Sequence, residues 1–308
     1  PAALANLAIT VTEAKCGFLH ALGWRTAEGE PATGTSTGAL ALAATGHGLL
    51  LPYAGPASNG PTAAQYLAAH YGVTVQLGWP TASAASNNYA VVGAMNDTRN
   101  YRVEIDNPPG LGAFFPALAT SGIAHQIARY QAVNPVVADP AHTLFMVWGG
   151  ANDLFLALES PGATPQSVAQ AVGLSLQALQ ADLQTLAGLG ARHLLVPSLP
   201  DLGLTPEGLA ADPLVAGALT GASLAYNAGL DQLLDGLAQV LTPLGVELYE
   251  FDTPTFFARI LADPAGYGFT NTTMSCFDAK APDLTNLLAG CPGYLYFDNV
   301  HPTTAGHA

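Results

Sequence analysis

A chain of 308 residues, half of them apolar, is long enough to bury one sizeable core, and we expect a single domain over residues 1–308. Eight lysines and arginines against 22 aspartates and glutamates give a formal net charge of −14. This charge argues against nucleic acid and anionic membranes as partners, because basic patches bind both. No apolar run reaches the roughly 18 residues of a membrane span, so no transmembrane segment is expected. The oligomeric state is left open.

From about residue 60 the sequence alternates between helical and strand patterns. Residues 60–71 carry helix punctuation, with Pro61 near the first helical position and Gly72 after the end. Thr164-Pro165 opens a long helix whose apolar residues recur every three or four positions. The other expected elements are a first strand in NLAITV (6–11), a short β-like run over 88–94, strands over 143–150, 193–197 and 246–251, and helices over 226–241 and 253–262.

This alternation predicts an α/β fold with three layers, α/β/α, around a mostly parallel central sheet. Residues 95–116 and 265–297 are expected to be long loops, which in a domain of this kind are often functional. No internal repeat and no linker divides the chain.

The three cysteines bear on the cellular compartment. Cys276 and Cys291 lie 15 positions apart in a loop-rich stretch and are expected to form a disulfide; the alternative is two reduced buried thiols. Cys16 has no expected partner. The cysteine pair and the low lysine content favour a secreted, periplasmic or extracellular protein. The missing initiator methionine favours a mature or trimmed fragment, and no cysteine or histidine pair has metal-ligand spacing.

Polar residues follow several predicted strands, where sites form in open α/β sheets. Asp298 lies three positions before His301, so its carboxylate can fix the imidazole tautomer and leave the other ring nitrogen as a base. The alternative is that Asp298 only caps a helix starting near Pro302. Asn152 and Gly93 can donate to an oxyanion from a side-chain amide and a backbone N–H. Their alternatives are a turn-forming asparagine and a glycine needed for backbone conformation.

Together these segments resemble the SGNH hydrolases, also called GDSL lipases/esterases. NYAVVGA (88–94), GGAND (149–153) and FDNVHPT (297–303) resemble three family blocks in the correct order. The resemblance extends over about residues 36–308. Segments 49–68, 196–206 and 265–271 look like the bacterial lecithinase/hemolysin-like branch. The resemblance to the SGNH hydrolases implies a flavodoxin-like three-layer fold, a triad acid and base at Asp298 and His301, and an oxyanion hole at Gly93 and Asn152.

The family's nucleophile block, Gly-Asp-Ser-Leu after a strand, is missing. The nearest substitute is GTST (34–37), which makes Ser36 the candidate nucleophile. The same serine fits the G-x-S-x-G nucleophile elbow, but no strand pattern precedes it. Three explanations stay open: an altered segment, a displaced working serine, or an inactive relative.

The function implied by the resemblance is a serine ester hydrolase, a lipase or esterase, acting on small-molecule or lipid esters through a Ser36, Asp298 and His301 triad. No metal or organic cofactor is implied. One alternative is a catalytically impaired protein that binds acylated lipid or glycan without turnover. Another is an enzyme for acetylated polysaccharide, which a wide polar cleft would favour over an apolar acyl groove.

Overall fold

A computed structural model describes residues 6–11, 58–79, 81–91, 93–105, 119–277 and 284–308. Ser36 and Cys16 lie outside these residues. The described strands are β1 (Asn6–Val11), β2 (Thr143–Trp148), β3 (His193–Pro197), β4 (Glu247–Phe251), β5 (Asn271–Ser275) and β6 (Tyr294–Tyr296). The described α-helices are α3 (Ala63–His70), α4 (Tyr101–Ile105), α7 (Ile123–Val133), α8 (Ala151–Glu159), α9 (Pro165–Gly188), α10 (Pro206–Ala210), α11 (Pro213–Leu241), α12 (Thr253–Ala262), α13 (Leu284–Leu288) and α14 (Thr304–His307).

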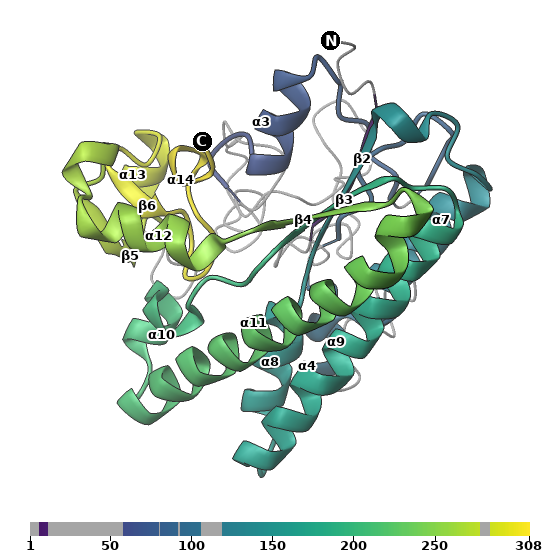
Figure 1. Ribbon diagram of the computed structural model, residues 1–308. Coiled ribbons are helices and arrows are strands. Elements are labelled where there is room, and N and C mark those ends of the chain that lie inside the picture. The colour runs from purple at the N-terminus through teal and green to yellow at the C-terminus, as the bar shows by residue number, and fades with distance from the viewer. Residues whose placement is uncertain (1–5, 12–57, 80, 92, 106–118, 278–283) are drawn as a thin grey trace.

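The main sheet has the order β1-β2-β3-β4, and every neighbouring pair is parallel. Alternate residues of β2 face opposite sides of it. Phe145 and Val147 pack into the large core with α7, α8, α9 and α11, whereas Leu144 and Met146 pack with α3. Figure 1 shows the long α9 and α11 lying side by side along one face, with α3 on the other. The predicted three-layer α/β/α class is therefore confirmed.

Several helix and strand boundaries follow the local signals. Thr164 caps α9 by accepting a hydrogen bond from the Ser167 nitrogen, with Pro165 at the first helical position. The predicted strand over 193–197 and the helix over 253–262 match β3 and α12. The helix predicted over 226–241 is longer and begins at Pro213, capped by Asp212. The first helix begins at Ala63 rather than at residue 60, because Thr62 makes the capping box with Gln65.

The strand predicted over 88–94 does not form among the described residues. Asn88 makes one isolated bridge to Leu77, and its side chain accepts a hydrogen bond from the Ala90 nitrogen at 3.1 Å. At the other end, the chain turns at Gly93, where φ is +73°. A side chain bonded to the backbone two residues on and a left-handed glycine both interrupt a strand ladder, so the β-like composition is overridden locally.

The region over 265–297, predicted as a loop, contains β5, α13 and β6. The strands β5 and β6 pair in a separate parallel two-stranded sheet. The predicted disulfide between Cys276 and Cys291 is present and packs with Phe277, Leu287 and Phe297. Among the described residues, no helix is both long and apolar enough to cross a membrane.

Candidate active site

Asp298 and His301 form a closed acid–base pair just after β6. Both carboxylate oxygens of Asp298 lie 2.9 Å from Nδ1 of His301. Oδ1 also accepts hydrogen bonds from the backbone nitrogens of Val300, at 2.9 Å, and His301, at 2.7 Å. Since an ionised carboxylate only accepts, the pairing places the ring proton on Nδ1 and makes Nε2 the basic nitrogen. The side chain of Asp298 is 2% exposed and that of His301 14%, so the acid is buried and the base reaches the surface.

The turn that carries this pair is held by its own backbone. The Phe297 nitrogen donates to the His301 carbonyl at 2.8 Å. The helix that follows, α14, is capped by Thr303, whose hydroxyl accepts from the Gly306 nitrogen at 3.3 Å. The alternative in which Asp298 caps this helix is therefore wrong, because Thr303 occupies the cap and Asp298 is bonded to the histidine.

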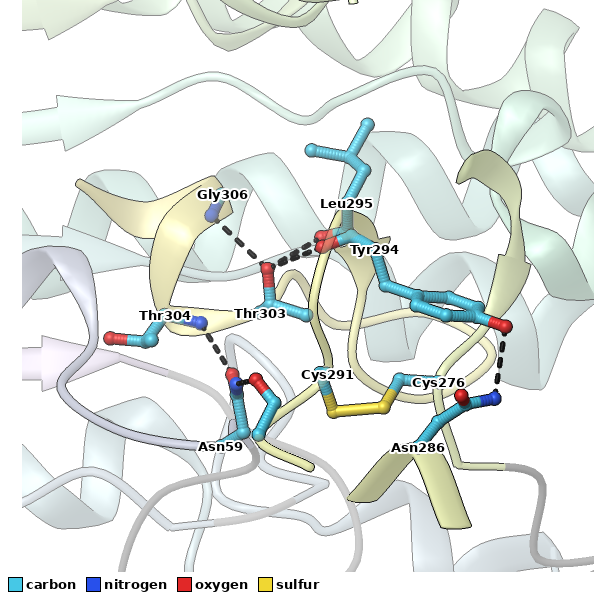
Figure 2. Close-up of a disulfide and its surroundings, with 10 residues drawn as sticks. Asn59, Cys276, Asn286, Cys291, Tyr294, Leu295, Thr303, Thr304 and Gly306 are labelled. Carbon is cyan, nitrogen blue, oxygen red and sulfur yellow. Dashed lines mark hydrogen bonds between the residues drawn. A yellow bond between two sulfur atoms is a disulfide. The ribbon is translucent and has the colours of Figure 1, made fainter. Parts of the chain in front are cut away.

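The disulfide packs against the strand that leads into the same turn. Figure 2 shows it beside Tyr294 and Leu295 of β6 and near the first turn of α14. Thr303 donates its hydroxyl to the Tyr294 carbonyl at 2.8 Å, which joins the helix start to the strand. Phe297, which packs on the disulfide, immediately precedes Asp298. The covalent link and its cluster thus anchor the strand that leads into the acid–base pair.

Gly93 lies in a turn that only glycine fits. Its φ is +73°, and a Cβ there would lie 2.6 Å from the Asn100 side-chain oxygen. The turn is closed by hydrogen bonds from the Ala94 nitrogen to the Val91 carbonyl, at 3.2 Å, and from the Tyr101 nitrogen to the Gly93 carbonyl, at 2.7 Å. A backbone in this conformation has its N–H groups at fixed angles, as an anion-binding turn requires.

Asn152 lies in the first turn of α8, directly after β2 and the Gly149-Gly150 pair. Its amide nitrogen donates to the Ala94 carbonyl at 2.9 Å, and the residue is 5% exposed. Helix N-termini favour negative charge, because their first N–H groups have no partner within the helix. The structure therefore bonds Asn152, at a helix N-terminus, to Ala94, the residue after Gly93.

Glu207 of α10 is hydrogen-bonded to the Asp298–His301 turn. Its backbone nitrogen donates to the Asn299 carbonyl at 2.8 Å, and its carboxylate accepts from the Asn299 amide at 3.1 Å. In α4, burial raises the pKa of Tyr101, and the hydrogen bond that its hydroxyl donates to Glu159 raises it further. The two hydrogen bonds of Glu207 thus join α10 to the turn that carries Asp298 and His301.

The parts of the site come from different sheets. Asn152 follows a strand of the main sheet, whereas Asp298 and His301 follow β6 of the small sheet. Gly93 follows no described strand. Asp298 and His301 thus follow a strand that pairs outside the main sheet.

Sequence reasoning missed the buried polar groups beneath Asn152. Asn96, Asp153, Ser175 and Tyr226 are joined by hydrogen bonds and close to fully buried. The available signal was weak: a serine and a tyrosine on otherwise apolar helix faces, and the aspartate of GGAND. Among the described residues, no group of three histidine, cysteine, aspartate or glutamate side chains is placed to hold a metal ion.

A parallel sheet covered by helices on both faces is consistent with the fold of the SGNH-type hydrolases. The family model described as GDSL-like lipase/acylhydrolase matches residues 34–308, and the chain belongs to this family. A second model, that of adenosylcobinamide amidohydrolase, matches residues 1–63 and overlaps the first over 34–63. The residues before 34, which the GDSL model does not match, are thus similar to part of another family.

Three relatives illustrate the family. A phosphatidylcholine-sterol acyltransferase of Aeromonas hydrophila is 29% identical over 54% of this chain and 57% of its own length. A thermolabile hemolysin of Vibrio parahaemolyticus is 22% identical over 62% and 45%. A GDSL esterase/lipase of Arabidopsis thaliana is 30% identical over 53% and 46%. The chain thus spans about half the length of these curated relatives.

Proposed function

We propose that the protein is a serine ester hydrolase of the lipase/esterase type, which cleaves carboxylic esters through an acyl-enzyme. The observation that supports this best is the Asp298–His301 pair, with a 2.9 Å contact from each carboxylate oxygen to Nδ1. A buried carboxylate that holds one ring nitrogen prepares the other to accept a proton from a hydroxyl.

In the proposed reaction, Nε2 of His301 takes the proton of the Ser36 hydroxyl as its oxygen attacks the ester carbonyl. The C–O bond to the leaving alcohol then breaks, and His301 returns the proton to that alcohol. Water attacks the acyl-enzyme by the same route and releases the acid and the free serine. Asp298 stabilises the imidazolium formed in each half. No electron transfer or cofactor enters this balance.

The oxyanion would be stabilised by Gly93, Asn152 and the nucleophile's own N–H. The amide of Asn152 has two N–H bonds, and one of them is used on the Ala94 carbonyl. That bond fixes the plane of the amide, so the second N–H points in a set direction. The Ala94 contact thus orients a donor rather than consuming it.

The substrate class we propose is a carboxylic ester on a small molecule or lipid. The relatives, an acyltransferase, a hemolysin and an esterase/lipase, support acyl chemistry. We also propose that the protein is secreted or periplasmic. The Cys276–Cys291 disulfide supports this, because such bonds persist in oxidising compartments.

The first test compares two matched histidine variants in p-nitrophenyl ester hydrolysis. His301→Ala should abolish turnover, whereas His142→Ala, which removes a similar but surface-exposed Asp–His pair, should leave it intact. Unchanged hydrolysis in His301→Ala would eliminate the proposed triad.

Labelling with a fluorophosphonate, followed by mass spectrometry, identifies the attacking residue. A label on Ser36 that is lost in Ser36→Ala supports the proposal. A label on a different serine moves the nucleophile and removes Ser36 from the mechanism.

A second candidate function is binding of acylated lipid or glycan without turnover. One observation favours it. Ser36 lies in residues 34–63, which both family models match, so the GDSL model is not alone in matching the candidate nucleophile. This candidate expects no serine to be labelled, no ester turnover, and retained binding of a long-chain acyl ligand by calorimetry. Turnover that depends on His301 would exclude it.

A further inference from the structure

The buried polar cluster beneath the Gly93 turn consists of Asn96, Asp153, Ser175 and Tyr226, called here the Asn96 cluster. The Asn96 amide nitrogen lies 2.9 Å from the Ser175 hydroxyl, 3.2 Å from the Ser175 carbonyl and 2.9 Å from the Tyr226 hydroxyl. The backbone nitrogen of Asn96 donates to the Asp153 carboxylate at 3.1 Å. None of the four residues is more than 5% exposed.

Each member of the cluster belongs to a different part of the fold. Asn96 follows the Gly93 turn, Asp153 lies in the first turn of α8, Ser175 in α9 and Tyr226 in α11. The hydrogen bonds therefore join the turn to three helices at one point. Figure 1 shows these helices packed on the same face of the sheet.

The cluster is in direct contact with the strand-to-helix turn that places Asn152. A Cβ on Gly149 would meet the Asn96 side-chain oxygen, and one on Gly150 would meet the Tyr226 ring. Gly150 also has φ +105°, which a residue with a side chain adopts only with strain. The two glycines thus let the backbone that leads into α8 rest on the cluster.

The Asn96 cluster contributes less to the stability of the fold than apolar side chains would at the same place. Burial raises the pKa of Asp153 to about 7, against the opposing hydrogen bonds from the Asn96 backbone and the Ser175 side chain. The Asn96 side-chain oxygen has no hydrogen-bond partner among the described residues. A buried carboxyl and an unpaired buried oxygen cost free energy that apolar side chains of similar size would avoid. What these groups supply instead is direction, since hydrogen bonds fix distances and angles that apolar packing does not.

We propose that Asn96, Asp153, Ser175 and Tyr226 are positioning residues that hold the Gly93 turn against the start of α8, so that the Gly93 N–H and the Asn152 amide keep one spacing. This inference rests on the proposed ester hydrolase function for its catalytic consequence. Asp153 follows Asn152 in sequence and Asn96 follows Ala94 by two residues, so the Asn96–Asp153 bond runs beside the Asn152–Ala94 bond. Two adjacent bonds between the same segments prevent rotation, which one bond permits.

The kinetic test uses Asp153→Ala, Asp153→Asn and Tyr226→Phe, with Asp182→Asn as the matched control. Asp182 is likewise a buried aspartate on α9, and its pKa is raised by burial and by the charge of Asp97 rather than by a member of the cluster. We expect Asp153→Ala to lower kcat about 10- to 100-fold with KM little changed, because misplaced oxyanion donors act on the transition state. Asp153→Asn keeps an acceptor for the Asn96 N–H and should recover most of the loss. Tyr226→Phe should give a smaller fall in kcat, and Asp182→Asn none.

A fall in kcat must be distinguished from partial unfolding of the variant, so thermal melting is measured on each variant. Asp153→Ala that melts as a folded protein yet keeps kcat within twofold of the unsubstituted chain would overturn the inference. So would an equal loss of kcat in the Asp182→Asn control.

A second measurement does not depend on activity. Hydrogen exchange by mass spectrometry should show faster exchange in the peptide containing residues 93–100 in Asp153→Ala, and no such change in Asp182→Asn. Equal protection of that peptide in both variants overturns the positioning role, even in a chain that hydrolyses no ester. Absent turnover in the unsubstituted chain sinks the proposed function alone, and the exchange result still decides the role of the cluster.

Discussion

The side chain of Asn59 accepts a hydrogen bond from the backbone nitrogen of Thr304 at 2.7 Å, across 245 positions of sequence. Its amide nitrogen donates to the Gly290 carbonyl at 2.9 Å. Asn59, which precedes α3 in the chain, is thus bonded both to the start of α14 and to the turn beside the disulfide. Figure 2 shows the bond to Thr304. Since α14 follows His301 directly, this asparagine fixes the far side of the acid–base turn.

Asn59→Ala should lower the free energy of unfolding by about 1–2 kcal/mol, because it removes the partner of the partly buried Thr304 N–H and Gly290 carbonyl. Urea denaturation measures this loss. Asn87→Ala is the control: Asn87 also makes two hydrogen bonds to backbone, with Gln76 and Thr74, but in an exposed loop. It should cost less, and equal losses in the two variants would contradict the role of Asn59.

Asp298→Asn should lower kcat for p-nitrophenyl ester hydrolysis by about 10²- to 10⁴-fold, since an amide neither fixes the tautomer nor stabilises the imidazolium. The chain has its own control in Asp139, which also lies three residues before a histidine and contacts Nδ1 of His142 at 3.0 and 3.1 Å. Asp139→Asn should leave kcat unchanged. Activity close to that of the unsubstituted chain in Asp298→Asn would remove the carboxylate from the mechanism.

Asp182 should make stability fall as pH rises. Burial raises its pKa to about 8, with the charge of Asp97 adding to it, and its Oδ2 has no hydrogen-bond partner among the described residues. The unfolded chain releases this proton near pH 4, so the native state binds more protons between about pH 4 and pH 8 and loses stability across that window. Above pH 8 the loss is complete.

Asp182→Asn removes this titration and should gain stability relative to the unsubstituted chain, by the order of a few kcal/mol at pH 8 and by little at pH 4. Denaturant titrations of both proteins at several pH values measure the difference, in which all shared titrations cancel. A difference that stays constant from pH 4 to pH 8 would show that Asp182 does not titrate in this window.

The disulfide should contribute about 3 kcal/mol, as expected for a closed loop of 15 residues. Cys276→Ala with Cys291→Ala should lower the midpoint of unfolding accordingly. Reductant should lower the midpoint of the unsubstituted chain toward that value and have no effect on the double variant. Insensitivity of both proteins to reductant would show that the bond does not form in solution.

Local signals in the sequence were sufficient for several elements. The Thr164-Pro165 start of α9 and the apolar strand that became β3 depend on caps, punctuation and periodicity within a few residues, which is why they were predicted correctly. The run NYAVVGA was predicted wrongly, because its strand-like composition competes with a left-handed glycine at Gly93.

The sequence by itself determined the fold class and the family resemblance, and it singled out Asp298, His301, Asn152 and Gly93 as candidate site residues. Only the tertiary structure showed that two Asp–His pairs of identical spacing differ in burial. Asp139 and His142 are 44% and 36% exposed, whereas Asp298 and His301 are 2% and 14% exposed. Burial and partners from distant segments decide which pair has fixed geometry, and the Asn96 cluster joins residues up to 130 positions apart. Residue spacing along the sequence does not predict such contacts, because they form only when separate elements pack.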